Sequence, residues 1–105
     1  MRFKDFQKIN LARNQKAKAF RKCKKWNMSD WTTSLAGEVG EFANIWKKVR
    51  RGDFTLDEKR EELGKELADV ITYADLMMTK LGLDTGKTVI AKFREVSRRI
   101  GWEYK

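Results

Sequence analysis

The sequence predicts an all-α fold, a four-helix bundle that assembles as a homo-oligomer, on three observations. Apolar residues recur with helical spacing in four segments, the chain contains no proline, and no segment alternates apolar and polar residues as a strand would. With 41% hydrophobic and 37% charged residues, the composition is typical of a globular protein rather than a disordered one. We expect one domain over residues 1–105, with a core small enough to favour self-association.

The first two predicted helices differ in how clearly the sequence marks them. The first covers residues 3–22 and carries apolar side chains among basic ones with an imperfect helical period. The second is capped at Ser29 or Asp30, whose side chains can accept hydrogen bonds from free backbone N–H groups. It ends at Gly52, which can adopt the left-handed conformation. Its apolar stripe is expected to be buried: Trp31, Leu35, Val39, Phe42, Trp46 and Val49.

The last two predicted helices are amphipathic along their length. Thr55 and Glu58 have the spacing of a capping box, so the third helix begins there and continues to Gly82. The fourth follows the segment GLDTG and ends at Gly101. We expect buried stripes on both, formed by Leu63, Leu67, Val70, Ile71, Ala74, Met78 and Leu81 on the third helix and by Val89, Phe93, Val96 and Ile100 on the fourth.

The charge distribution and the cysteine content indicate the class of binding partner and the cellular compartment. The formal net charge is +9, and residues 13–25 contain seven basic side chains and no acidic one, whereas ten of the fifteen acids lie between Glu38 and Asp75. Such an excess favours a polyanionic partner, either a nucleoside triphosphate or nucleic acid. The single Cys23 cannot form an internal disulfide, and no apolar run suits a signal peptide or a membrane span. We therefore expect a cytoplasmic protein with no membrane contact.

Two pairs of carboxylates border the apolar stripes of the second and third helices. Glu38 and Glu41 are three residues apart, as are Glu66 and Asp69, so each helix offers a pair on one face. If the stripes pack together, the four groups meet between the helices, where their mutual repulsion requires a cation. Carboxylate oxygens suit Mg²⁺, with Mn²⁺ as a substitute, and Mg²⁺ commonly joins protein carboxylates to substrate phosphates.

The spacing alone also fits a simpler interpretation. In a chain with 37% charged residues, paired acids on helices are usually solvated and neutralised by basic residues one turn away. Lys65 next to Glu66 does not share its face and does not neutralise that line of acids. The position of Lys65 weakens the solvated interpretation, but spacing by itself still favours it, and the choice depends on further residues.

A family resemblance favours the metal site. The segments LAGEVGEFANIWKKVRRGD, ELGKELADVITYADLMMTKLG and KFREVSRRIG, within residues 30–101, resemble the MazG-like nucleotide pyrophosphohydrolases of the all-α NTP pyrophosphatase superfamily. The E-x-x-E and E-x-x-D pairs of that family fall on Glu38, Glu41, Glu66 and Asp69. The resemblance implies a MazG-like domain in which these four residues are metal ligands and catalytic groups. It also implies Mg²⁺-dependent cleavage of a (d)NTP between the α and β phosphates, giving (d)NMP and pyrophosphate.

The resemblance further implies a homo-dimer or homo-tetramer with sites near subunit interfaces, and other residues are candidates for binding the substrate. Asn44 and Lys48 lie on the same side of the second helix as the glutamate pair, and Tyr73 can stack on a base or ribose. On the fourth helix, Lys92 can reach phosphate oxygens. Arg94 can bind phosphate too, but relatives commonly have asparagine there, so the contact made by that asparagine is not carried over. With no histidine in the chain, the general base is expected to be a carboxylate or metal-activated water.

Two other function classes stay open from the sequence. The basic residues 13–25 and the nearby Trp26 fit a helical nucleic-acid-binding module without catalysis, but such a module leaves the acidic pairs unexplained. A catalytically silent assembly protein would keep only the helical scaffold. The pyrophosphohydrolase is the main prediction and a nucleotide is favoured over nucleic acid as the partner, with the base and sugar of that nucleotide left open.

Overall fold

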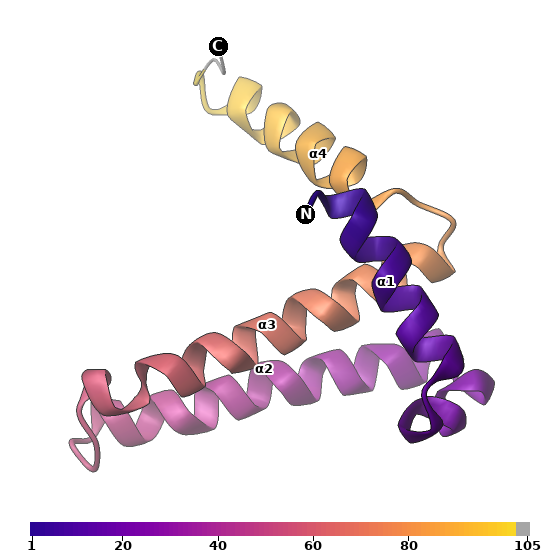
Figure 1. Ribbon diagram of the computed structural model, residues 1–105. Helices are drawn as coiled ribbons and strands as arrows, with labels where there is room; N and C mark the ends of the chain where they lie inside the picture. Colours follow the sequence, from indigo (N-terminus) through magenta and orange to yellow (C-terminus); the bar gives the residue numbers. More distant parts are fainter. Residues whose placement is uncertain (103–105) are drawn as a thin grey trace.

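The computed structural model describes residues 1–102, and within them the chain is all-helical with no strand. Its elements are α1 (Phe3–Lys16), the 3₁₀ helix η1 (Lys18–Lys25), α2 (Met28–Arg50), α3 (Leu56–Lys80) and α4 (Thr85–Arg99). Figure 1 shows α2 and α3 as a long antiparallel pair, with α1 crossing the C-terminal part of α3 and α4 projecting away. No helix in the described part is both long and apolar enough to cross a bilayer.

The main hydrophobic core is small and lies where η1, α2 and α3 meet. Trp31 is 1% exposed, which confirms the prediction that this residue of α2 is buried. The ring of Trp26 meets that of Trp31 edge-to-face, with 4.9 Å between the ring centroids. The core comprises Cys23, Trp31 and Leu76, with Phe20, Trp26, Tyr73 and Met77 packed around them.

The prediction of one helix over residues 3–22 is wrong beyond residue 16. The helix α1 ends at Lys16, and the 3₁₀ helix η1 follows it. The reason is a three-residue repeat: Ala17, Phe20, Cys23 and Trp26 are buried or half-buried, and every residue between them is exposed. A 3₁₀ helix has three residues per turn, so it places these four side chains on one line. An α-helix would rotate each successive member of the repeat by about 60° away from the core.

The helix starts show one confirmed cap and one correction. At α3, Glu58 N donates to Thr55 Oγ1 at 3.2 Å and Thr55 N donates to Glu58 Oε1 at 2.9 Å, which confirms the predicted capping box. The start of α2 lies earlier than the predicted cap at Ser29 or Asp30. Asn27 is the cap, because its side chain accepts a hydrogen bond from Asp30 N at 3.0 Å, and Asp30 accepts one from Asn27 N at 2.9 Å.

One chain alone does not close a four-helix bundle. The helix α4 contacts α1 and α3 but not α2, and the radius of gyration is 16.6 Å, against about 13 Å for a compact domain of this length. Several positions that the sequence predicted to be buried are exposed within one chain, because α1 and α4 leave much of the apolar surface of α2, α3 and α4 uncovered. These positions are Val39, Trp46, Leu67, Ile71, Leu81, Val89, Phe93 and Ile100.

A buried polar junction joins α1, α3 and α4. Asp75 of α3 is 1% exposed and accepts hydrogen bonds from Asn10 Nδ2 of α1, at 2.9 Å, and from the hydroxyl of Thr85 at the start of α4. Gln7 of α1 adds a second link, since its Oε1 accepts a hydrogen bond from Thr85 N at 3.0 Å. These hydrogen bonds hold the first turn of α4 against α1 and α3.

Candidate functional site

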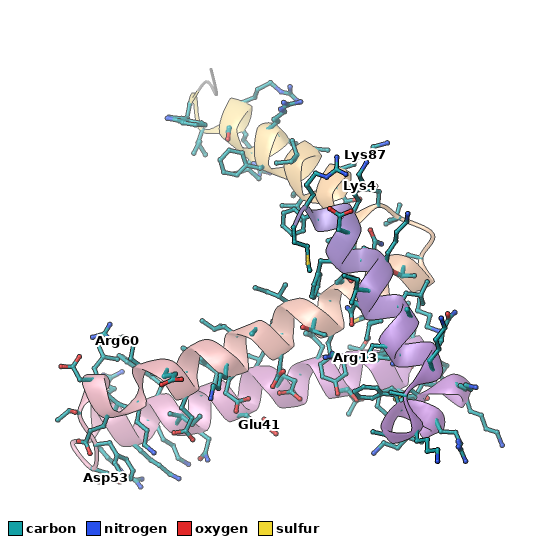
Figure 2. The ribbon with its side chains drawn as sticks, in the orientation of Figure 1. Lys4, Arg13, Glu41, Asp53, Arg60 and Lys87 are labelled. Carbon is teal, nitrogen blue, oxygen red and sulfur yellow. The ribbon has the colours of Figure 1, made fainter. Side chains whose placement is uncertain are left out.

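The antiparallel packing of α2 and α3 brings three of the four predicted carboxylates together. One oxygen from each of Glu38, Glu66 and Asp69 lies within 4.8 Å of the other two, and we call these three residues the carboxylate trio. Glu41, labelled on α2 in Figure 2, is not part of the trio. Its carboxylate is nevertheless close enough to raise the pKa of both Glu38 and Glu66. Three of the four carboxylates that were predicted to converge therefore do so within a single chain, and Glu41 lies nearby without joining the group.

Two oxygens of the trio are buried without a hydrogen-bond partner, namely Oε2 of Glu38 and Oε2 of Glu66. A buried polar atom that loses its water and gains no partner costs free energy. Within residues 1–102, no Lys or Arg forms an ion pair with the trio or with Glu41. Neighbouring acids on α3 are paired, as Glu62 is with Lys59 at 3.1 Å. The solvated, salt-bridged interpretation describes those neighbours but not the trio.

The electrostatics of the trio follow from burial and like charge. Burial raises the pKa of Glu38 to about 7, and the charges of Glu41 and Asp69 act in the same direction. The Glu41 carboxyl group, followed by burial, raises the pKa of Glu66. The pKa of the Tyr73 hydroxyl is also raised, first by burial and then by the charge of Glu38. In the protein alone the ionised cluster is destabilised, and a cation would relieve that repulsion.

The donor set of the trio fits a hard divalent cation. Mg²⁺ and Mn²⁺ prefer carboxylate oxygens, and opposite ligands of Mg²⁺ lie about 4.2 Å apart. Because the three oxygens already lie within 4.8 Å of one another, a small side-chain rotation would let them share one ion. The two buried oxygens without a hydrogen-bond partner, Oε2 of Glu38 and Oε2 of Glu66, also fit a cation, which could bind to them directly. Glu38, Glu66 and Asp69 could therefore hold the metal, with Glu41 beside them.

A cavity of about 230 Å³ adjoins the trio. Glu38, Asp69 and Tyr73 line one side, and α1 and η1 line the other. Arg13 is the only basic side chain among the lining residues of the described chain, and its guanidinium carbon lies 5.5 Å from the centroid of the Phe20 ring. The cavity thus combines an acidic end, one cation and aromatic walls, which suits a ligand with an anionic part and a ring.

Sequence reasoning missed the contribution of α1 to this cavity. Asn10, Arg13 and Asn14 line it, and they follow i, i+3, i+4, which places them on one helix face. Asn10 and Asn14 are buried, at 3% and 7% exposure. The sequence does contain a sign of this face, because these three polar residues recur at helical spacing in a segment whose apolar residues do not. Apolar spacing alone does not reveal it, because the buried face of α1 is partly built from amides.

Two of the predicted substrate-binding residues on the hairpin lie apart from the cavity. Tyr73 lines the cavity and packs against Trp31, with 6.0 Å between the ring centroids. Asn44 is exposed and Lys48 is half-buried on α2, and neither lines the cavity. One chain therefore brings Tyr73, but not Asn44 or Lys48, to the cavity beside the trio.

The two residues of α4 that were predicted to bind phosphate, Lys92 and Arg94, do not line the cavity beside the trio. Lys92 forms an ion pair with Glu95 at 3.5 Å, and Arg94 borders an apolar groove with Val89, Ile90 and Phe93. Because α4 does not contact α2, this chain does not bring Lys92 or Arg94 to its own glutamate pair. Their roles in binding phosphate stay predictions that need a second chain.

The functional interpretation of this site depends on its own geometry. Comparisons of the chain with protein-family models, curated proteins and solved structures find no match. The converging carboxylates, their two buried unpartnered oxygens and the adjoining cavity are the observations from which a function can be inferred.

Proposed function

We propose that this chain is a Mg²⁺-dependent nucleoside triphosphate pyrophosphohydrolase of the MazG-like type, which cleaves a (d)NTP to (d)NMP and pyrophosphate. The observation that carries the proposal is the carboxylate trio, with two buried oxygens that lack any partner and no basic residue paired to it within residues 1–102. The sequence resemblance supplies the reaction, because the same residues match the metal-binding pairs of that family.

The residues of the site have complementary roles in this proposal. Glu38, Glu66 and Asp69 would hold Mg²⁺, or Mn²⁺ in its place, beside the triphosphate, and we infer that the neighbouring Glu41 joins them as a ligand when the ion binds. The bound ion would neutralise charge on the phosphate oxygens and on the leaving group. A carboxylate of the cluster accepts a proton as a water molecule adds to the α phosphorus. The bond from that phosphorus to the oxygen bridging the α and β phosphates breaks, and this oxygen leaves with the pyrophosphate.

The cavity beside the trio is the proposed site for the nucleoside end. Tyr73 offers a ring surface for a base or ribose, and Arg13 offers a cation for a phosphate. Its volume of about 230 Å³ is smaller than the roughly 300 Å³ at the low end of small-molecule sites. One chain therefore does not enclose a whole nucleotide. We infer that a second chain, in a cytoplasmic homo-dimer or homo-tetramer, completes the site and brings Lys92 or Arg94 to the phosphates.

A screen of natural and modified NTPs with Mg²⁺, in which monophosphate and pyrophosphate are both quantified, tests this function. Glu41→Gln keeps the side-chain shape and removes a charge, so we expect turnover to fall by at least roughly a hundredfold while the fold survives. Glu61→Gln is the matched control, because Glu61 is exposed on α3 and, within residues 1–102, its one ion pair is the exposed contact with Lys65 at 3.8 Å. A folded Glu41→Gln variant with near wild-type turnover would refute the proposed site.

A further inference from the structure

The basic side chains of η1 and of Lys16, the last residue of α1, are exposed and do not line the cavity of the candidate site. All six basic residues between positions 16 and 25 are exposed, and we call them the cationic surface: Lys16, Lys18, Arg21, Lys22, Lys24 and Lys25. The residues of η1 that line the cavity are Phe20 and Cys23, which belong to the inward line of the three-residue repeat. The charge on the other two faces of η1 therefore does not serve the proposed nucleotide site.

The positive charge of this surface is not compensated within the described chain. Residues 13–25 contain no acid, and no member of the cationic surface forms an ion pair within residues 1–102. The nearest acid in sequence, Asp30, already accepts a hydrogen bond from the backbone of Asn27. Lys80 of α3 adds a further cation at this end, with its Nζ 5.9 Å from the Trp31 ring centroid. Figure 2 shows nitrogen-tipped side chains projecting outward around η1. Like charges held this close repel one another, so an anionic partner would stabilise them.

The spacing of these cations suits a polymer better than a compact anion. A 3₁₀ helix rises about 2 Å per residue, so Lys18, Arg21 and Lys24 form a ridge with a step of about 6 Å. Lys22 and Lys25 form a second ridge with the same step. A nucleotide would contact one or two of these side chains, whereas duplex nucleic acid carries about one negative charge per 1.7 Å of its axis. Both ridges can then contact phosphates at once.

We propose that the two outer faces of η1 bind the phosphate backbone of double-stranded nucleic acid, without sequence preference, at a surface separate from the carboxylate trio. The aromatic residues next to the ridges, Phe20 and Trp26, are packed against the core. Both rings are half-buried, so among the described residues beside the ridges little ring surface is offered for stacking on single-stranded bases. The ridges themselves consist of Lys and Arg and present no apolar side chain to a bilayer. Backbone phosphates of a duplex are the partner that these features favour.

Fluorescence anisotropy of a labelled duplex, measured over a range of salt concentrations with the full chain, tests the proposal. The test variant replaces Lys18, Lys22, Lys24 and Lys25 with Gln. Its affinity should fall by at least about tenfold at low salt, and the slope of log K against log salt should become shallower by about 0.9 for each phosphate that the variant no longer neutralises. The matched control replaces the exposed Lys4, Lys8, Lys47 and Lys87 with Gln, removes the same charge, and should keep most of the affinity.

Several results would overturn the proposal. One is equal weakening by the two fourfold variants, because binding would then follow net charge alone. Absence of duplex binding by the wild-type chain at low salt is another, as is tighter binding to single strands or to phosphatidylserine vesicles than to duplex. Circular dichroism checks that both variants fold, and the milder Lys22→Gln, Lys25→Gln variant provides a second test. Glu41→Gln should bind duplex normally, so loss of hydrolysis does not decide this question.

Discussion

The carboxyl group of Glu38 is partly buried and lies close to other carboxylates, and both features raise its pKa. Its spacing to Glu41 is legible in the sequence, and so is its position beside an apolar stripe. Its burial, its unpartnered Oε2 and the approach of Asp69 depend on how α2 packs against α3. Sequence spacing therefore identified the carboxylates, whereas the choice between a solvated face and a metal site required the packed helices.

The raised pKa of Glu38 predicts how stability depends on pH in metal-free protein. Its pKa is about 7 in the folded chain, against 4.5 for an ordinary glutamate, so the folded state holds the proton more tightly. The stabilisation is complete below about pH 4.5 and is lost as pH rises through about 7. Glu38→Gln stays neutral, so above pH 7 it should be more stable than wild type by about 1–2 kcal/mol, allowing for solvent screening.

Urea unfolding in the presence of a chelator, at pH 5.5 and pH 8, measures this effect. The difference in unfolding free energy between the two pH values should shrink in Glu38→Gln and stay unchanged in Glu61→Gln. If Glu38→Gln shows the same pH dependence as wild type, the self-repulsion that we attribute to the carboxylate cluster is absent.

At the scale of elements, the sequence predicted long, well-capped helices better than the elements whose form depends on packing. The third helix was predicted from Thr55 and Glu58, a local signal that needs no tertiary contact. The segment after Lys16 was wrongly extended as α-helix, although its repeat of three was present in the letters AKAFRKCKKW. A period of three becomes decisive only once Phe20 and Cys23 have a core to pack against.

The junction at Asp75 predicts a large effect of a single substitution on the arrangement of α1, α3 and α4. Asp75→Ala removes the acceptor of the buried Thr85 hydroxyl and one of the two acceptors of Asn10 Nδ2, so we expect a loss of about 2–4 kcal/mol in unfolding free energy. Asp57→Ala is the control, because its ion pair with Arg60 is exposed and should contribute less than about 1 kcal/mol. Chemical denaturation compares the two, and equal losses would contradict a structural role for the junction.

The whole molecule is more open than the sequence alone indicates. A bundle was predicted because apolar stripes on four helices can cover one another, but α4 leaves the hairpin and exposes Phe93 at 51% and Ile71 at 56%. Periodicity identifies which face of a helix is apolar, and it does not identify which chain covers that face. That a second copy of the chain covers these surfaces, in the homo-oligomer predicted from the sequence, stays a prediction.

Light scattering at micromolar concentration tests the oligomer, with a dimer or tetramer as the expected result. Introducing charge on the exposed apolar face of α3, as Leu67→Arg with Ile71→Arg, should lower the mass to that of a monomer and reduce hydrolysis, because the proposed site is shared. Glu61→Arg places the same side chain on another exposed face of α3 and should leave the mass unchanged. A strictly monomeric wild-type chain would contradict the shared site.

The most direct test of the proposed reaction is to let the wild-type protein hydrolyse its NTP with Mg²⁺ in water enriched in heavy oxygen, and to analyse both products by mass spectrometry. Attack on the α phosphorus puts the label in the nucleoside monophosphate and leaves the pyrophosphate unlabelled. That result is expected for a triphosphate held by Glu38, Glu41, Glu66 and Asp69 through the metal. Label in pyrophosphate, or release of orthophosphate and nucleoside diphosphate, would contradict the account.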